Sequence, residues 1–75
     1  MRADRMTDDG IMMCCAELEM DGEIGFDTTC RATARSHIRR MNEWLADNHY
    51  VLRAELTIDK GMRFPFGAKA VEKEK

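Results

Sequence analysis

Closely spaced carboxylates are the side chains of this chain best suited to chemistry. Glu17, Glu19 and Glu23 lie close together in the first third of the chain, and Glu55 lies in a later stretch that alternates apolar and polar residues. Paired carboxylates can act as general acid and base where a desolvated site drives their pKa values apart. The alternation predicts that these side chains lie mostly on an open sheet face in water, which supplies no desolvation. We therefore expect these side chains to form a partner-binding face and not a catalytic site, and we expect that the protein is not an enzyme.

Arginines recur at helical spacing in the middle of the chain: Arg31, Arg35 and Arg39, with Arg40 nearby. At 1.5 Å per residue the first three line up along about 12 Å of one helix face. Such a row suits phosphate or carboxylate recognition. The simplest alternative is a solvated face on which Asp27 pairs with Arg31 and Glu43 pairs with Arg39 or Arg40. A protein-facing surface is the third reading.

Thiols and imidazoles form no recognisable metal or redox motif. Cys14 and Cys15 are adjacent, Cys30 is distant, and His37 and His49 stand at unrelated spacings. An odd number of cysteines without a Cys-x-x-Cys motif is a poor disulfide or zinc framework. We expect reduced thiols that pack as small hydrophobes, with Cys30 on a buried helix stripe, and no metal or cofactor.

The size of the chain limits what it can enclose, and its charge is divided along the sequence. With 75 residues it forms one domain that buries about 60–65% of its unfolded surface, too little for a deep pocket. Residues 1–27 hold eight acids and two bases, whereas residues 28–75 hold ten bases and six acids. The longest apolar run, residues 11–16, is too short for a bilayer, and no secretory signal is visible. We expect a cytoplasmic protein without a membrane span.

Two strands are predicted in the first third, after a flexible lead-in over residues 1–10. In residues 11–20 every second side chain, from Met12 to Met20, is apolar and forms one face of the predicted strand. The outer side carries Ile11, Met13 and Cys15, followed by Glu17 and Glu19. A bulged turn at Asp21-Gly22 would pair this strand with residues 23–26.

A helix is predicted over residues 28–47, because the apolar period changes to about 3.6 after Asp27. Asn48 would end it in a left-handed conformation. A third strand over residues 50–58 and a turn at residues 59–61 follow. The turn would pair Ile58 with Met62, Leu56 with Phe64 and Ala54 with Phe66.

These elements predict an α+β fold: a two-layer ββαββ unit over residues 11–66, with one helix on one face of a four-stranded sheet. The sheet would be mainly antiparallel with strand order 2-1-3-4, and a mixed sheet ordered 1-2-3-4 is the alternative. Pro65 would make the fourth strand an edge, and residues 67–75 would be a frayed tail.

The resulting hypothesis is a small non-enzymatic binding protein that docks on a basic, nucleic-acid-handling protein. Phage-encoded inhibitors of host RNA polymerase or of a CRISPR complex are the analogous class by size and charge. The contacts would come from Glu17, Glu19, Glu23, Glu55, Met13 and Cys15. A homodimer could cover the apolar part of this face, and the exposed edge strands could add a strand from a partner. A nucleic-acid-binding module that uses the arginine row is the alternative function.

Overall fold

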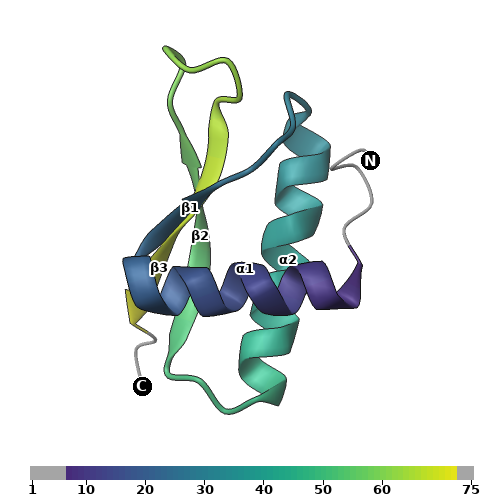
Figure 1. Ribbon diagram of the computed structural model, residues 1–75, viewed down its shortest axis with the longest axis vertical. Coiled ribbons are helices and arrows are strands. Elements are labelled where there is room, and N and C mark those ends of the chain that lie inside the picture. The colour runs from purple at the N-terminus through teal and green to yellow at the C-terminus, as the bar shows by residue number, and fades with distance from the viewer. Residues whose placement is uncertain (1–6, 73–75) are drawn as a thin grey trace.

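The computed structural model describes residues 7–72, which form two helices and a three-stranded sheet (Figure 1). In chain order the elements are α1 (Asp8–Asp21), β1 (Glu23–Gly25), α2 (Arg31–Asp47), β2 (Leu52–Ile58) and β3 (Phe66–Glu72). The sheet is antiparallel with order β1-β3-β2, and both helices pack on one of its faces and on each other. The predicted α+β class is confirmed. The four strands and the single helix are not.

Residues 11–20 form most of α1 and not the predicted first strand. The three buried side chains Ile11, Cys15 and Leu18 follow helical spacing. The Thr7 hydroxyl accepts a hydrogen bond from the first turn, and Gly22, with a φ of 85°, donates its N–H back to Leu18. Because every residue from 11 to 16 is apolar, this stretch fits the two-residue period of a strand as well as the 3.6-residue period of a helix. The two caps and the long-range packing decide in favour of the helix.

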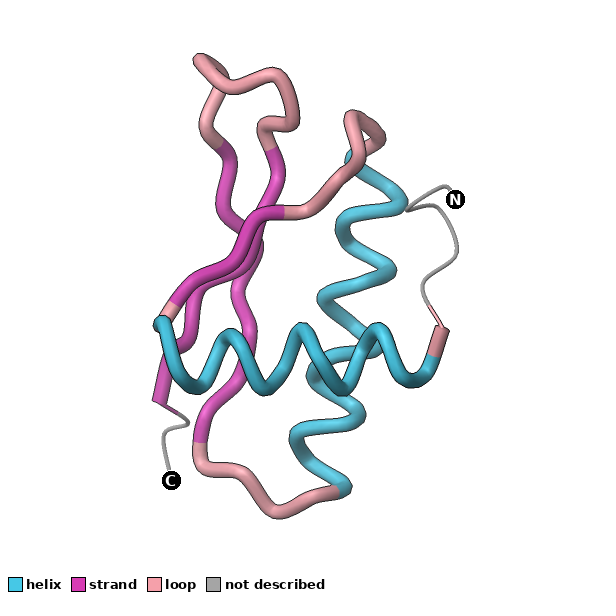
Figure 2. Tube along the Cα trace, in the orientation of Figure 1, coloured by secondary structure: helices cyan, strands magenta, loops and turns pink. Residues whose placement is uncertain are grey.

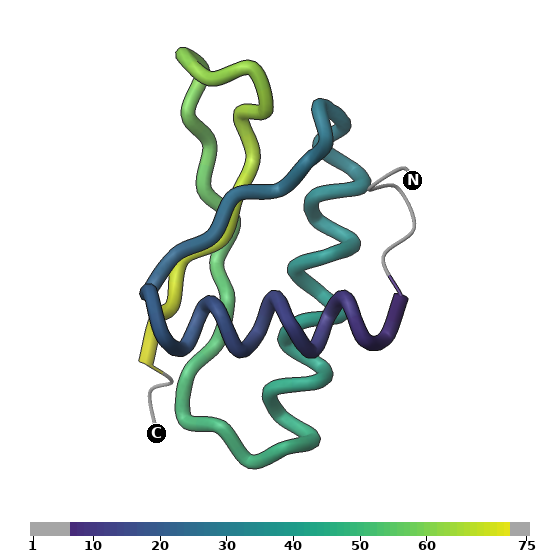
Figure 3. The backbone as a smooth tube through the Cα atoms, in the orientation of Figure 1, coloured from purple at the N-terminus to yellow at the C-terminus, as the bar shows by residue number. Residues whose placement is uncertain are grey.

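The helix changes the role of Asp21-Gly22, which ends α1 and is not a hairpin turn. The short strand predicted next exists as β1, but it pairs with β3 at the other end of the sequence, with Ile24 opposite Ala68. Figure 3 shows this contact between residues 23–25 and the end of the described chain.

The predicted helix over residues 28–47 corresponds closely to α2, but both of its ends differ. Cys30 is the N-terminal cap residue and is exposed, so it does not join the buried stripe. The Thr28 hydroxyl accepts a hydrogen bond from the Cys30 amide at 3.1 Å. At the other end Asn48 has a φ of −102°, and the left-handed residue is His49. The buried residues of the helix are Ala34, His37, Met41 and Leu45.

The hairpin after α2 has a longer loop than predicted, because Ile58 pairs with Phe66 and not with Met62. Residues 59–65 form the loop that projects beyond the sheet in Figure 2. Pro65 lies in this loop and accepts a hydrogen bond from the Asp59 amide at 2.7 Å, so it does not mark an edge strand. Residues 67–72, predicted as part of a frayed tail, instead belong to the central strand β3.

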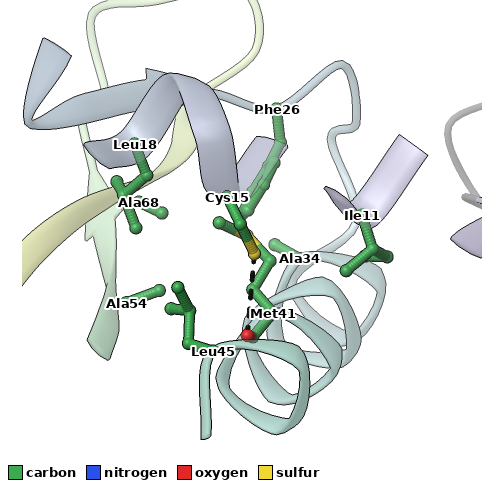
Figure 4. Close-up of a cluster of buried hydrophobic side chains, with 9 residues drawn as sticks. All are labelled: Ile11, Cys15, Leu18, Phe26, Ala34, Met41, Leu45, Ala54 and Ala68. Carbon is green, nitrogen blue, oxygen red and sulfur yellow. Dashed lines mark hydrogen bonds between the residues drawn. The ribbon is translucent and has the colours of Figure 1, made fainter. Parts of the chain in front are cut away.

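Small residues allow β3 to occupy the centre of the sheet. A Cβ atom at Gly67 would overlap the carbonyl oxygen of Ile24 in β1, so this position requires glycine. Ala68 is fully buried beneath the helices, where Figure 4 shows it facing Leu18. The core consists of Ile11, Cys15, Leu18, Phe26, Ala34, Met41, Leu45, Ala54 and Ala68. Within residues 7–72, neither helix is long and apolar enough to cross a membrane.

Candidate protein-interaction surfaces

The solvent side of α1 combines exposed methionines with acidic residues. The side chains of Met13 and Met20 are 64% and 82% exposed, which makes them the most exposed large apolar side chains of this helix. They share one helix face with acidic and small neighbours. We define the α1 outer face as Asp9, Met13, Ala16, Glu17 and Met20, with Met12 and Glu19 on its flank.

The charged side chains of α1 are all acidic. The 14 residues of α1 include five acidic side chains and no lysine or arginine. Apolar residues lie on both its buried and its exposed side, whereas a surface helix is ordinarily apolar only toward the core. Of the predicted binding residues, Met13, Glu17 and Glu19 are therefore brought together here, on a helix and not on the sheet.

A groove continues from α1 to the second half of α2. Its volume is about 350 Å³, and it lies where the two helices cross. The Arg40 guanidinium contributes one positive charge here and lies 3.1 Å from the Asp8 carboxylate. The groove is lined by Asp8, Asp9, Ile11, Met12, Arg40, Glu43, Trp44 and Asp47. Four carboxylates against one guanidinium extend the negative surface of α1 across the helix crossing.

The other predicted acids do not form an acidic sheet face. Lys69 on β3 is the cross-strand partner of both Glu23 on β1 and Glu55 on β2. Arg53 also lies 2.9 Å from the Glu55 carboxylate. Because two basic residues sit among these two acids, the open sheet face is mixed in charge. Glu23 and Glu55 are separated from the α1 outer face by the fold.

The arginine row is present on α2 as predicted. Arg31, Arg35 and Arg39 are exposed, and Arg35 and Arg39 line a shallow hollow with Ala32 and Ser36. Within residues 7–72 the predicted pairs of Arg31 with Asp27 and of Arg39 with Glu43 are not formed. Arg40 points to the other side of the helix, toward Asp8.

Cys15 cannot contact a partner, because it is fully buried against α2 (Figure 4). Its thiol donates a hydrogen bond to the Met41 carbonyl oxygen at 3.7 Å. Burial, with a smaller contribution from Cys14, raises the pKa of Cys15 to about 11. Burial also raises the pKa of Cys14, and the Glu17 carboxylate raises it further. Both thiols are therefore held protonated and unreactive near neutral pH.

A second groove lies beside β1, and sequence reasoning missed it. Its volume is about 270 Å³, and its walls come from the end of β1 and the loop between β2 and β3. Met62 and Phe64 are exposed along it, and the Arg63 guanidinium stacks over the Phe64 ring at 5.4 Å. The predicted register placed Met62 and Phe64 in a strand facing the core, so no signal in the strand pattern indicated the groove.

The two edges of the sheet are finished differently. On β2, the side chain of Asn42 bonds to both backbone groups of Ala54. On β1, the backbone at Glu23 and Gly25 faces the second groove.

Within residues 7–72, no set of three or more histidine, cysteine, aspartate or glutamate side chains could hold a metal ion. Comparison of the chain with protein-family models, curated proteins and solved structures finds no match.

Proposed function

We propose that this protein is a small non-enzymatic binding protein whose α1 outer face docks on a basic protein partner. The observation that carries the proposal is the pair of exposed methionines, Met13 and Met20, on a helix with five acidic and no basic side chains. Exposed apolar groups favour association because binding removes them from water, and the surrounding carboxylates select a positively charged surface.

Methionine suits such a contact because its unbranched side chain adapts to an imperfect surface. Removing one such side chain from water contributes about 1.5–3 kcal/mol when burial is complete. The groove at the helix crossing adds the carboxylates of Glu43 and Asp47 on α2 beside this face. The matching partner therefore presents apolar side chains within a basic surface.

Nucleic-acid-handling proteins are the partner class that this chemistry favours, because their binding channels are strongly basic. A partner covered by an acidic helix at that channel would lose access to its nucleic acid. We therefore propose an inhibitor or modulator, of the kind that phages encode against host RNA polymerase or CRISPR complexes.

The test is affinity capture from the lysate of the native host, followed by affinity measurement on each captured protein. We expect a basic protein to bind the wild type and to bind Met13→Ser/Met20→Ser and Glu17→Lys/Glu19→Lys at least about tenfold more weakly. Asp27→Lys/Glu72→Lys carries the same charge change away from α1 and should bind normally. Equal binding by all four proteins would contradict the proposal.

A second candidate function is binding of a nucleic-acid backbone through Arg31, Arg35 and Arg39. The observation in its favour is that these side chains are exposed and lack the predicted acidic partners within residues 7–72. Gel shifts should then show an affinity that falls steeply with salt and is lost in Arg35→Glu. Such a result with the wild type would replace the inhibitor hypothesis.

A further inference from the structure

We propose that the free edge of β1 binds an extended, basic peptide segment as a fourth strand of the sheet. This site is separate from the α1 outer face and does not depend on the function proposed for it. The occupant is a segment of a protein partner with an apolar residue followed, two positions later, by lysine or arginine.

The hydrogen bonds between β1 and β3 determine which backbone groups reach the free edge. The Phe26 amide donates to the Phe66 carbonyl at 2.9 Å, and the Ala70 amide donates to the Gly22 carbonyl at 2.8 Å. In an antiparallel ladder, alternate residues direct both backbone groups toward the partner strand and the residues between them direct both away. Glu23 and Gly25 therefore present their N–H and C=O groups at the edge of the sheet.

On the opposite edge of the sheet, a side chain occupies backbone groups of β2 that could otherwise pair with another strand. Asn42 occupies both backbone groups of Ala54 on β2. Exposed edges invite pairing with another chain, and proteins commonly blunt them in such ways. Within residues 7–72 no side chain makes an equivalent hydrogen bond to Glu23 or Gly25. Asn42 thus blocks the middle of the β2 edge at Ala54, whereas the edge of β1 carries no such block.

The groove beside this edge determines the side chains of the segment. Gly25 pairs with Gly67, and no atom lies within 4 Å of a Cβ position at Gly25, so this part of the groove is open. A side chain opposite Gly25 can lie over these two glycines against Met62 and Phe64, which are 60% and 39% exposed. That position therefore favours an apolar residue.

Charge determines the second position. The groove lining contains the carboxylates of Glu23 and Asp59. Lys69 lies opposite Glu23 on the β3 side and Arg63 stacks over Phe64, so the side of Glu23 that faces away from β3 is where a further basic side chain would lie. A strand added antiparallel to β1 first passes Gly25 and then Glu23, so its apolar residue precedes its residue near the carboxylates by two positions. A lysine or arginine there complements Glu23. Since β1 has only three residues, the segment is short and its two side chains carry much of the specificity.

The first test uses the blocked peptide Thr-Leu-Thr-Lys-Val-Thr as the probe, with binding measured by calorimetry. Methylating the amide nitrogen of its leucine removes a donor to β1 and should weaken binding at least about tenfold. Methylating the amide of the threonine between leucine and lysine alters a group that points away, and should leave the affinity within about threefold. Equal affinities of the two methylated peptides, or no binding of the parent peptide at millimolar concentration, would overturn the proposal.

The second test changes the protein. A Cβ atom at Gly25 meets no other atom within 4 Å, so we expect Gly25→Val to fill the groove, keep the thermal unfolding midpoint and bind the peptide at least about tenfold more weakly. Val51→Ser, an exposed apolar change away from the groove, should bind normally. Glu17→Lys/Glu19→Lys should also bind normally, which separates this site from the α1 outer face. Unchanged peptide affinity in Gly25→Val would overturn the proposal.

A second copy of the chain is the alternative occupant of this edge. Sedimentation of the wild type and of Gly25→Val identifies it. We expect a monomer in both cases at micromolar concentration. A wild-type dimer that dissociates in Gly25→Val would assign the edge to self-association and overturn the assignment to a basic segment.

Discussion

The side-chain amide of Asn42 pairs with the backbone of Ala54 as a neighbouring strand would. Its Nδ2 donates to the Ala54 carbonyl oxygen at 3.1 Å, and its Oδ1 accepts from the Ala54 amide nitrogen at 2.7 Å. This contact ties the middle of α2 to the edge of β2. It satisfies backbone groups that would otherwise be open to strand pairing.

Replacing Asn42 should therefore have two consequences. Asn42→Ala removes both hydrogen bonds and should lower the free energy of unfolding by about 1–3 kcal/mol, measured in urea. It should also expose the β2 edge and increase self-association in sedimentation experiments. Asn48→Ala is the control, because Asn48 makes one exposed bond to the Trp44 carbonyl oxygen and should cost less than about 1 kcal/mol. Similar effects of the two changes would contradict this role of Asn42.

Truncation of Leu18 and Met20 distinguishes a helix from a strand over residues 11–20. In a strand these two side chains share a face, whereas in α1 Leu18 is fully buried and Met20 is 82% exposed. Leu18→Ala should lower the free energy of unfolding by about 2–5 kcal/mol, and Met20→Ala should change it by less than about 0.5 kcal/mol. Comparable losses at both positions would indicate a strand.

Gly25 and Gly67 face each other across β1 and β3 but should tolerate alanine differently. Gly67→Ala forces a Cβ atom against the Ile24 carbonyl oxygen, and we expect a loss of about 1–3 kcal/mol. Gly25→Ala meets open space and should be neutral or stabilise by up to about 1 kcal/mol. Chemical denaturation measures both. A harmless Gly67→Ala would mean that β1 does not approach β3 as closely as described.

Ionisation of Cys15 should destabilise the fold at high pH. Its pKa is raised from 9.0 to about 11, so between these values the unfolded chain releases a proton that the folded chain retains. The contribution of the neutral thiol is thus complete below pH 9 and is lost as the pH rises toward 11. For one proton the slope is at most about 1.4 kcal/mol per pH unit. Unfolding free energies at pH 8–11 should fall less steeply in Cys15→Ala than in the wild type, and parallel curves would contradict this assignment.

Thiol accessibility offers an independent check on the three cysteines. Cys30 is exposed at the start of α2, Cys14 is half-buried and Cys15 is buried. A chromogenic disulfide reagent should therefore modify Cys30 rapidly in the folded protein and Cys15 only at the rate of unfolding. Cys30→Ser should remove the rapid phase. The half-buried Cys14 should react more slowly than Cys30, so a phase as rapid in this variant as in the wild type would contradict the described exposure of the three thiols.

Local sequence determined α2 almost completely. Its apolar residues follow a single period of 3.6, and the predicted range of residues 28–47 includes all of Arg31–Asp47. The exposed arginine row follows directly from that spacing. The α+β class and the exposure of Glu17 and Glu19 were also accessible from the sequence, because charged residues concentrate where a chain meets water. The predicted strand placed Met13 outside together with Ile11 and Cys15, and of these three only Met13 is exposed.

Tertiary structure decided the elements whose local pattern is ambiguous. Residues 11–20 fit both a strand and a helix, and packing of Cys15 and Leu18 against α2 and β3 favours the helix. Residues 67–72 have weak strand propensity, yet Gly67 and Ala68 are the small residues that the crowded centre of the sheet accepts. The groove beside β1 and the contrast between the two sheet edges follow from this pairing. They depend on contacts between residues far apart in the chain, which local periodicity does not encode.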